Sequence, residues 1–225
     1  MKNWIFVALV TTVCLWSQKA GSEPLFAKSE CIPADAIVLF DGSGMSKWVE
    51  HGSDKTPAWK VEKGYATAGP GNIVTRQQFG DCQLHVEFWL PLMRDARGQA
   101  RANSGVYLQG SYEVQVLDSY GLNSQPNDCG AIYGVSAPLV NACRPAETWQ
   151  TYDIVFHAPV FDADGKQVKN ARMTVLQNGV LIQDNVEVPS PTVAAIARDI
   201  KARGPVMLQF HGNAVRYRNI WIRNL

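Results

Sequence analysis

Short stretches in which apolar and polar residues alternate recur along the chain, and turns containing glycine or asparagine separate them. Residues 82–90 are the clearest case, with apolar side chains at every second position. The dipeptide Asn178-Gly179 between two further stretches is the strongest short-range signal for a β-hairpin. Roughly ten to twelve short strands at this spacing are typical of an all-β sandwich or jelly roll. Residues 193–203 are the one segment that favours a short helix.

The length and charge of the chain indicate how many domains it forms and which partners it is not expected to bind. The chain has 225 residues and is 46% hydrophobic, which suits one large core-forming β domain. No repeat or linker divides it, so residues 36–225 are expected to form a single domain. With 21 Lys and Arg against 20 Asp and Glu, and no basic run, the chain is not expected to bind nucleic acid. The sequence does not indicate an oligomeric state.

The N-terminus has the pattern of a secretory signal peptide over residues 1–22. A short basic start precedes an almost wholly apolar run at residues 4–16, and small residues follow at 20–22. The run is too short for a stable membrane span, so we expect an exported protein, periplasmic or extracellular. Lipidation at Cys14 and an uncleaved anchor are the less favoured alternatives.

Four cysteines remain after removal of the expected signal peptide: Cys31, Cys82, Cys129 and Cys143. An even number in an exported chain suggests disulfides, and four cysteines allow three pairings. Cys129 and Cys143 bracket part of one long connection, which favours the pairs Cys129–Cys143 and Cys31–Cys82. Four buried thiols are the alternative, and the absence of a Cys-x-x-Cys motif disfavours zinc.

A predicted hairpin at residues 103–119 carries the most informative polar side chains. Glu113 and Gln115 are two residues apart on a strand, so they share a face at about 7 Å. Asp118 joins that face only if a β-bulge intervenes. Ionisable and amide groups on a strand otherwise suited to burial indicate a function rather than a packing role.

An ordered set of segments extends across nearly all of the mature chain: 39–42, 103–107, 112–119, 130–133, 149–153, 176–180, 208–212 and 216–222. This set resembles the bacterial exported proteins of the 3-keto-disaccharide hydrolase domain family. The resemblance implies an all-β, concanavalin A-like jelly-roll sandwich of two antiparallel sheets. It also implies activity on sugars that are oxidised at C3.

Laminarinase-like retaining glucanases of this fold carry Glu-x-Asp-x-x-Glu on an inner strand. Glu113-x-Gln115-x-x-Asp118 has the same spacing, but glutamine replaces the central Asp and Asp replaces the last Glu. A retaining mechanism needs two carboxyl groups about 5–5.5 Å apart. The side chain of Asp118 is shorter than that of Glu by one methylene group, so its carboxyl group lies further back, which disfavours a retaining mechanism.

A 3-keto group offers a different route, because it acidifies the hydrogen at C2. Its removal needs a base near C2, an electrophile or metal at the C3 oxygen, and an acid for the leaving group. Glu113 is the candidate base, and a surface salt bridge is its alternative role. His211 is a candidate to polarise the ketone or donate a proton, and Asp118 a candidate second acid or base. A divalent metal, if one is used, would be held by these three side chains.

Five further residues are candidates for binding a small carbohydrate. Gln115 and Gln209 have amides suited to sugar hydroxyls. Asn103 opens its strand, where it either caps a turn or reaches the ligand. Tyr133 and Arg144 lie on the long connection, where they either hold the sugar or simply pack and solubilise the loop.

These residues favour a hydrolase or lyase that cleaves 3-keto-glycosides, specifically 3-keto-disaccharides. The alternative is a non-catalytic sugar-binding module of the same fold, since fold alone does not determine function. A binding module needs amides and aromatic rings but no base. Convergence of Glu113, Asp118 and His211 in one cleft would therefore favour the enzyme.

Overall fold

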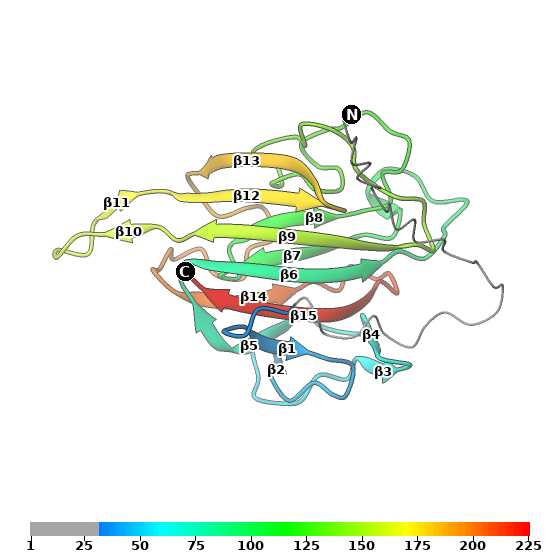
Figure 1. Ribbon diagram of the computed structural model, residues 1–225, viewed down its shortest axis with the longest axis horizontal. Coiled ribbons are helices and arrows are strands. Elements are labelled where there is room, and N and C mark those ends of the chain that lie inside the picture. Colours follow the sequence, from blue (N-terminus) through cyan, green and yellow to red (C-terminus); the bar gives the residue numbers. More distant parts are fainter. Residues whose placement is uncertain (1–31) are drawn as a thin grey trace, which may run out of the picture. The chain divides into compact units, whose positions relative to one another are not determined.

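Two antiparallel β-sheets pack face to face in the compact unit Pro33–Leu225 (Figure 1). The structure is a computed structural model that describes residues 32–225. The predicted signal peptide, residues 1–22, and Cys31 lie outside the described residues. The predicted all-β, concanavalin A-like sandwich is confirmed. Within residues 32–225, no helix is long and apolar enough to span a membrane.

The larger sheet has eight strands, and β15 lies inside it, paired with β6, β4 and β1. From one edge, its strands are β13 (Val180–Val188), β12 (Ala171–Gln177), β9 (Trp149–His157), β6 (Cys82–Trp89), β15 (Arg216–Asn224), β4 (Tyr65–Thr67) and β3 (Lys60–Glu62), with β1 (Ile37–Phe40) also on β15. Residues distant in sequence meet in register here, with Ile222 opposite Leu84.

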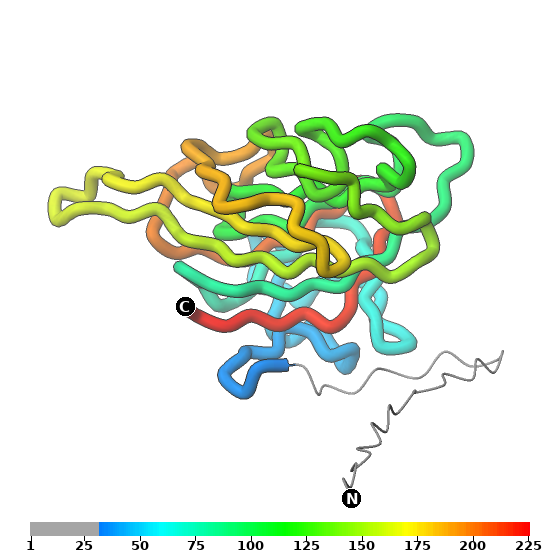
Figure 2. The backbone as a smooth tube through the Cα atoms, turned by 45° about the horizontal axis from the view of Figure 1, so that its top comes forward, coloured from blue at the N-terminus to red at the C-terminus, as the bar shows by residue number. Residues whose placement is uncertain are grey.

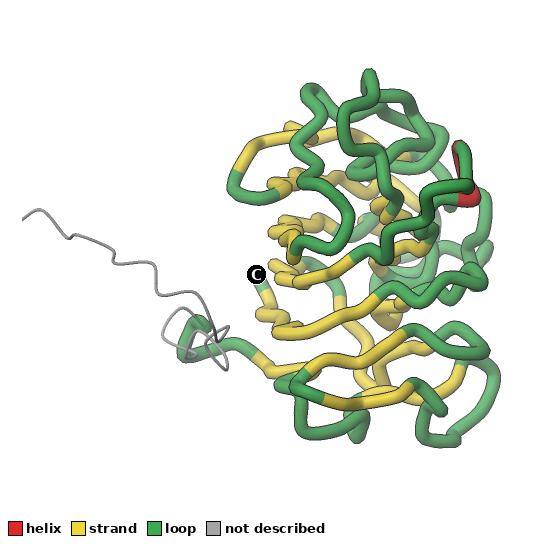
Figure 3. Tube along the Cα trace, turned by 90° about the vertical axis from the view of Figure 1, so that its right-hand side faces the viewer, coloured by secondary structure: helices red, strands yellow, loops and turns green. Residues whose placement is uncertain are grey.

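The smaller sheet has five strands and carries the hairpin predicted at residues 103–119. In order they are β2 (Trp48–Glu50), β5 (Ile73–Phe79), β14 (Gly204–Leu208), β7 (Ser104–Leu108) and β8 (Tyr112–Val116). A separate two-stranded arm, β10 (Val160–Phe161) and β11 (Gln167–Lys169), projects beyond β9 and β12 in Figures 1 and 2. The short 3₁₀ turn η1 (Gly98–Ala100) is the red segment in Figure 3.

Burial follows the alternation in the sequence on most strands, but not on β8. On β6, Leu84, Val86 and Phe88 are buried, and the residues between them are partly exposed. All five residues of β8 are buried, including Glu113 and Gln115. Loops that cover the outer face of the smaller sheet account for this difference, and they leave polar side chains enclosed beneath them.

An ion-pair network lies on the outer face of the larger sheet. His85 Nδ1 is 2.7 Å from Asp153 Oδ1, and Arg218 Nε donates to Glu87 Oε2 at 2.6 Å. Burial lowers the pKa of His85, but its contacts with Asp153 and Glu87 outweigh burial and raise it to about 9. The stability that this histidine contributes is therefore present below its ordinary pKa of 6.5 and is lost as pH rises through about 9.

The helix expected at residues 193–203 is absent, and the segment is a loop. Its backbone groups bond to the turn of the β7–β8 hairpin instead. Ile196 N donates to Gly110 O at 2.9 Å, and Ser111 Oγ donates to Ala197 O at 2.8 Å. The loop is thereby tied over the smaller sheet.

The predicted disulfide between Cys129 and Cys143 is not formed. Both are free thiols. Gln177 Nε2 lies 3.5 Å from Cys129 Sγ and 3.4 Å from Cys143 Sγ, so the two sulfurs take part in a hydrogen-bonded polar cluster. Cys31, the expected partner of Cys82, lies outside the described residues, so that pairing stays a prediction.

Candidate active site

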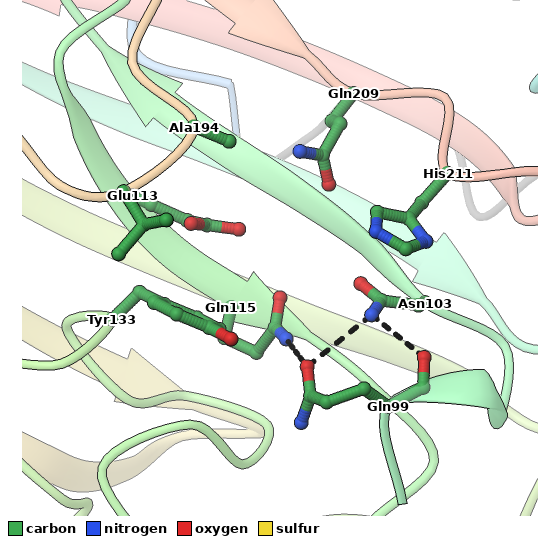
Figure 4. A pocket seen from close by; sticks show the side chains of 9 residues that line it. Gln99, Asn103, Glu113, Gln115, Tyr133, Ala194, Gln209 and His211 are labelled. Carbon is green, nitrogen blue, oxygen red and sulfur yellow. Dashed lines mark hydrogen bonds between the residues drawn. The ribbon is translucent and has the colours of Figure 1, made fainter.

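A cavity of about 150 Å³ opens on the outer face of the smaller sheet. It gathers side chains from β8, from the segments before β7 and after β14, and from two covering loops (Figure 4). Most of the predicted site residues line it: Asn103, Glu113, Gln115, Tyr133, Gln209 and His211. The structure thus brings together groups that lie up to about a hundred residues apart in the sequence.

Strand alternation explains why β8 supplies two of these groups. Tyr112, Val114 and Val116 belong to the hydrophobic core, so Glu113 and Gln115 face the opposite side. Tyr133 is positioned by the backbone of the same strand, because its N–H donates to Glu113 O at 3.2 Å. The covering loop is therefore fixed in register with the strand that carries the candidate base.

Glu113 is the buried carboxyl group of the cavity, with only 3% of its surface exposed. Burial raises its pKa to about 7, while a hydrogen bond from Tyr107 acts in the opposite direction. None of the residues that line the cavity is Lys or Arg. A carboxyl group poised near neutral pH can accept a proton from a weak carbon acid and later release it.

Amide groups form the middle of the cavity and are held in fixed orientations. Gln99 accepts from Gln115 Nε2 at 2.9 Å through its side-chain Oε1. Asn103 Nδ2 donates to Gln99 O at 2.8 Å and to Gln99 Oε1 at 3.2 Å. Neutral, oriented donors and acceptors of this kind suit the hydroxyl groups of an uncharged sugar.

His211 lies in the turn after β14 and is exposed to solvent. Figure 4 shows His211 and Glu113 at opposite ends of the cavity, with Asn103 and Gln115 between them. A ligand in the cavity would thus have a buried carboxyl group on one side and an imidazole on the other.

Asp118 and Arg144 are not among the residues that line the cavity. β8 ends at Val116, and no bulge turns Asp118 onto the face of Glu113. Its carboxylate instead accepts from Arg101 Nη2 at 2.7 Å. Arg144 Nη1 donates to Trp149 O at 3.2 Å. The structure therefore does not bring these two side chains into the cavity, and their catalytic and sugar-binding roles stay predictions.

The predicted metal ligands do not converge either, because Asp118 is paired with Arg101 outside the cavity. Among residues 32–225, no group of three or more His, Cys, Asp and Glu side chains is arranged to hold a metal ion.

Four residues at or behind the cavity were missed in the sequence: Gln99, Tyr107, Val193 and Ala194. Tyr107 had a readable signal, because a hairpin turning at residues 109–111 places it opposite Glu113. Gln99 lies in the connection between β6 and β7, and the two apolar residues come from the segment expected to be helical, so none of the three had a local signal.

We expect Arg101→Met to lower the free energy of unfolding by about 3 kcal/mol, because it leaves the Asp118 carboxylate buried without its cation. Urea denaturation measures the change. The matched control is Arg172→Met, whose partner Glu187 is 52% exposed, and its expected loss is below about 1 kcal/mol. Equal losses in the two variants would contradict a structural role for the Arg101–Asp118 pair.

Comparison with known proteins gives a family match over almost the whole described unit. The sequence profile of the 3-keto-alpha-glucoside-1,2-lyase-like domain matches residues 35–223. A solved structure of a candidate glycosyl hydrolase from Parabacteroides distasonis is 40% identical, with a TM-score of 0.79 over 86% of this chain and 85% of the other. Among curated proteins, none matches the chain at a significant level.

Two further candidate glycosyl hydrolases from the same organism share the fold. One is 19% identical with a TM-score of 0.61, and covers 85% of this chain and 94% of its own. The other is 21% identical with a TM-score of 0.59, and covers 84% of this chain and 99% of its own.

Proposed function

Because the chain belongs to the family of 3-keto-alpha-glucoside-1,2-lyase-like domains, we propose that it cleaves 3-keto-glycosides, among them 3-keto-disaccharides, by eliminating the C1 substituent. It is a carbohydrate-active domain of that family, and the family implies a sugar ligand. The observation that carries the proposal is Glu113, a single buried carboxyl group with a pKa of about 7 in an amide-lined cavity. The signal-peptide pattern of residues 1–22 supports action after export.

The proposed reaction begins with the Glu113 carboxylate removing the proton from C2. The electron pair of the broken C–H bond forms a C2=C3 double bond, and the negative charge moves to the C3 oxygen. The C3 carbonyl then re-forms, the pair shifts to C1=C2, and the bond from C1 to the departing oxygen breaks. The products are a 1,2-unsaturated 3-keto sugar and the released alcohol or sugar, and addition of water to the first product would complete a net hydrolysis.

Side chains that line the cavity can meet two further needs of this reaction. The charge on the C3 oxygen needs hydrogen-bond donors, which the side-chain amides and the His211 imidazole can supply. The departing oxygen needs a proton, and Tyr133 and His211 are the cavity residues with a suitable O–H or N–H group. Proton removal by Glu113 and proton delivery by another group keep the net charge of the site unchanged.

A non-catalytic sugar-binding module is the alternative, and the amides of the cavity would serve it equally well. Such a module does not need a base, whereas a buried carboxyl group with a pKa raised to about 7 suits proton transfer at neutral pH. The position of Glu113 therefore favours the enzyme.

The proposal is tested by incubating the purified protein with a 3-keto-disaccharide, with and without a chelator, and following the released sugar by chromatography and mass spectrometry. The parent disaccharide, which lacks the ketone, is the control and should not be cleaved. In heavy water, deuterium should enter C2 of recovered substrate when proton removal is reversible. No release under any metal condition would overturn the proposal for that substrate.

We expect kcat/KM to rise with pH to a plateau, with a midpoint at about 7, because only the ionised form of Glu113 can accept the C2 proton. Initial rates at low substrate concentration, measured from about pH 5 to about pH 9, give this midpoint. A midpoint near the ordinary glutamate value of 4.5 would show that the base is not the buried Glu113 carboxyl group.

A further inference from the structure

The side-chain amide of Gln209 is bonded at one end only. Gln209 is 7% exposed, and its Nε2 donates to the Tyr107 hydroxyl at 3.1 Å. Its Oε1 is buried and has no hydrogen-bond partner within the described part of the chain. Figure 4 shows this oxygen pointing into the cavity, on the side that faces Asn103. A buried acceptor without a partner is costly, so a bound ligand that donates a hydrogen bond there would be favoured.

The orientation of this amide follows from its neighbours. Tyr107 lies opposite Glu113 in the strand pair, both side chains lie against Gly105, and the Tyr107 hydroxyl acts as a donor that opposes the rise in the pKa of Glu113. An ionised carboxylate can only accept, so Tyr107 gives its proton to Glu113 and must itself accept from the Nε2 end of Gln209. If the amide were reversed, Gln209 Oε1 and the Glu113 carboxylate would both need the single proton of the Tyr107 hydroxyl. The acceptor end of Gln209 is therefore the end left for the cavity.

The carboxyl group of Glu113 packs closely against Gly105 on the neighbouring strand, β7. A Cβ atom at Gly105 would lie 2.5 Å from Glu113 Oε1 and 2.7 Å from Tyr107 Cε2. Any larger residue at this position would push both side chains away. Gly105 and Tyr107, two residues apart on β7, thus form one side of the site on which Glu113 rests.

We propose that Gln209 Oε1 accepts a hydrogen bond from a ring hydroxyl of an uncharged sugar, and that this contact orients Glu113 through Tyr107. The inference rests on the proposed function, in which Glu113 is the base. Binding of the hydroxyl fixes the Gln209 amide, the fixed amide holds the Tyr107 oxygen, and the Tyr107 proton then holds the carboxylate toward the cavity. Tyr107 is a positioning residue, whereas Gln209 touches the sugar.

The relay is tested first without turnover. Protein labelled with ¹³C at the glutamate carboxyl groups is titrated, and the Glu113 signal is identified by its loss in Glu113→Gln. In Tyr107→Phe, which keeps the ring, the midpoint of Glu113 should rise by about one pH unit because the bond that favours the ionised form is gone. An unchanged midpoint in Tyr107→Phe would overturn the relay.

The hydroxyl contact is tested by calorimetry with methyl α-D-glucoside as the binding probe, because this sugar lacks the ketone and is not expected to be cleaved. Gln209→Met should weaken binding about 10-fold or more and also raise the Glu113 midpoint, since it removes both the acceptor and the donor to Tyr107. The matched control is Gln115→Met, which changes a residue that lines the same cavity but is hydrogen-bonded to Gln99 rather than to Tyr107, and which should weaken binding without moving the midpoint. Unchanged affinity in Gln209→Met, or equal midpoint shifts in the two variants, would overturn the inference.

These outcomes separate the inference from the function on which it rests. A wild-type protein that binds the probe and shows the Tyr107 and Gln209 effects, but does not cleave the 3-keto-disaccharide, would retain the hydroxyl site and overturn the proposed reaction. A protein that cleaves the substrate with a Glu113 midpoint unaffected by Tyr107→Phe would retain the reaction and overturn the relay.

Discussion

Glu113→Gln is expected to lower kcat on a 3-keto-disaccharide by about 10³-fold, because a positioned general base contributes on the order of 10²–10⁴ in rate. Glutamine keeps the size and polarity of the side chain but cannot accept the C2 proton. Single-turnover measurements at about pH 8, where the wild-type carboxyl group is mostly ionised, isolate the chemical step.

The matched control for this loss is Glu62→Gln, which neutralises a glutamate on β3 that does not line the cavity. Its rate should stay within about twofold of the wild type, since surface substitutions away from the site change little. A loss of less than about 10-fold in Glu113→Gln would place the base elsewhere in the molecule.

Glu113→Gln should also stabilise the fold at alkaline pH. Burial raises the pKa of Glu113 from 4.5 to about 7, so the folded state holds a proton that the unfolded state has released between these values. Wild-type stability therefore falls as pH rises from about 4.5 to about 7, and Glu113→Gln lacks this contribution. The variant should gain about 3 kcal/mol over the wild type above pH 7 relative to their difference at pH 4.

Urea denaturation of both proteins at several pH values measures this difference. The His85 network also makes stability depend on pH, but it is present in both proteins and cancels in the comparison. A difference that stays constant across the pH range would show that Glu113 has an ordinary pKa in the folded state. A gain in stability together with a loss of rate would identify Glu113 as a group whose burial serves chemistry at the expense of the fold.

Local sequence pattern was sufficient for the sheets and for part of the site. Alternation on residues 82–90 correctly predicts β6, and the turn at Asn178-Gly179 correctly joins β12 to β13. The shared face of Glu113 and Gln115 follows directly from the two-residue period of a strand. Gln209 and His211 carry side chains that suit sugar binding and proton transfer, and the pairing of β14 with β7 brings them to the same cavity as Glu113.

The remaining features depend on contacts that no local pattern contains. Asp118 has a suggestive spacing from Glu113, but the strand ends before it and Arg101 neutralises it. Residues 193–203 have the composition of a short helix, yet their backbone groups bond to Gly110 and Ser111. The burial of both faces of β8 comes from loops far away in the sequence, and it is this burial that sets the pKa of Glu113.

The internal position of β15 has a consequence for how the domain assembles. Residues 216–224 pair with β6 on one side and with β1 and β4 on the other, so they join segments that begin about 180 residues earlier in the chain. Until β15 is in place, β6, β1 and β4 each have an edge with unsatisfied backbone groups, and such edges favour pairing between chains. We therefore expect slow folding limited by this long-range closure, and a chain cut before residue 216 should aggregate rather than form a smaller sandwich.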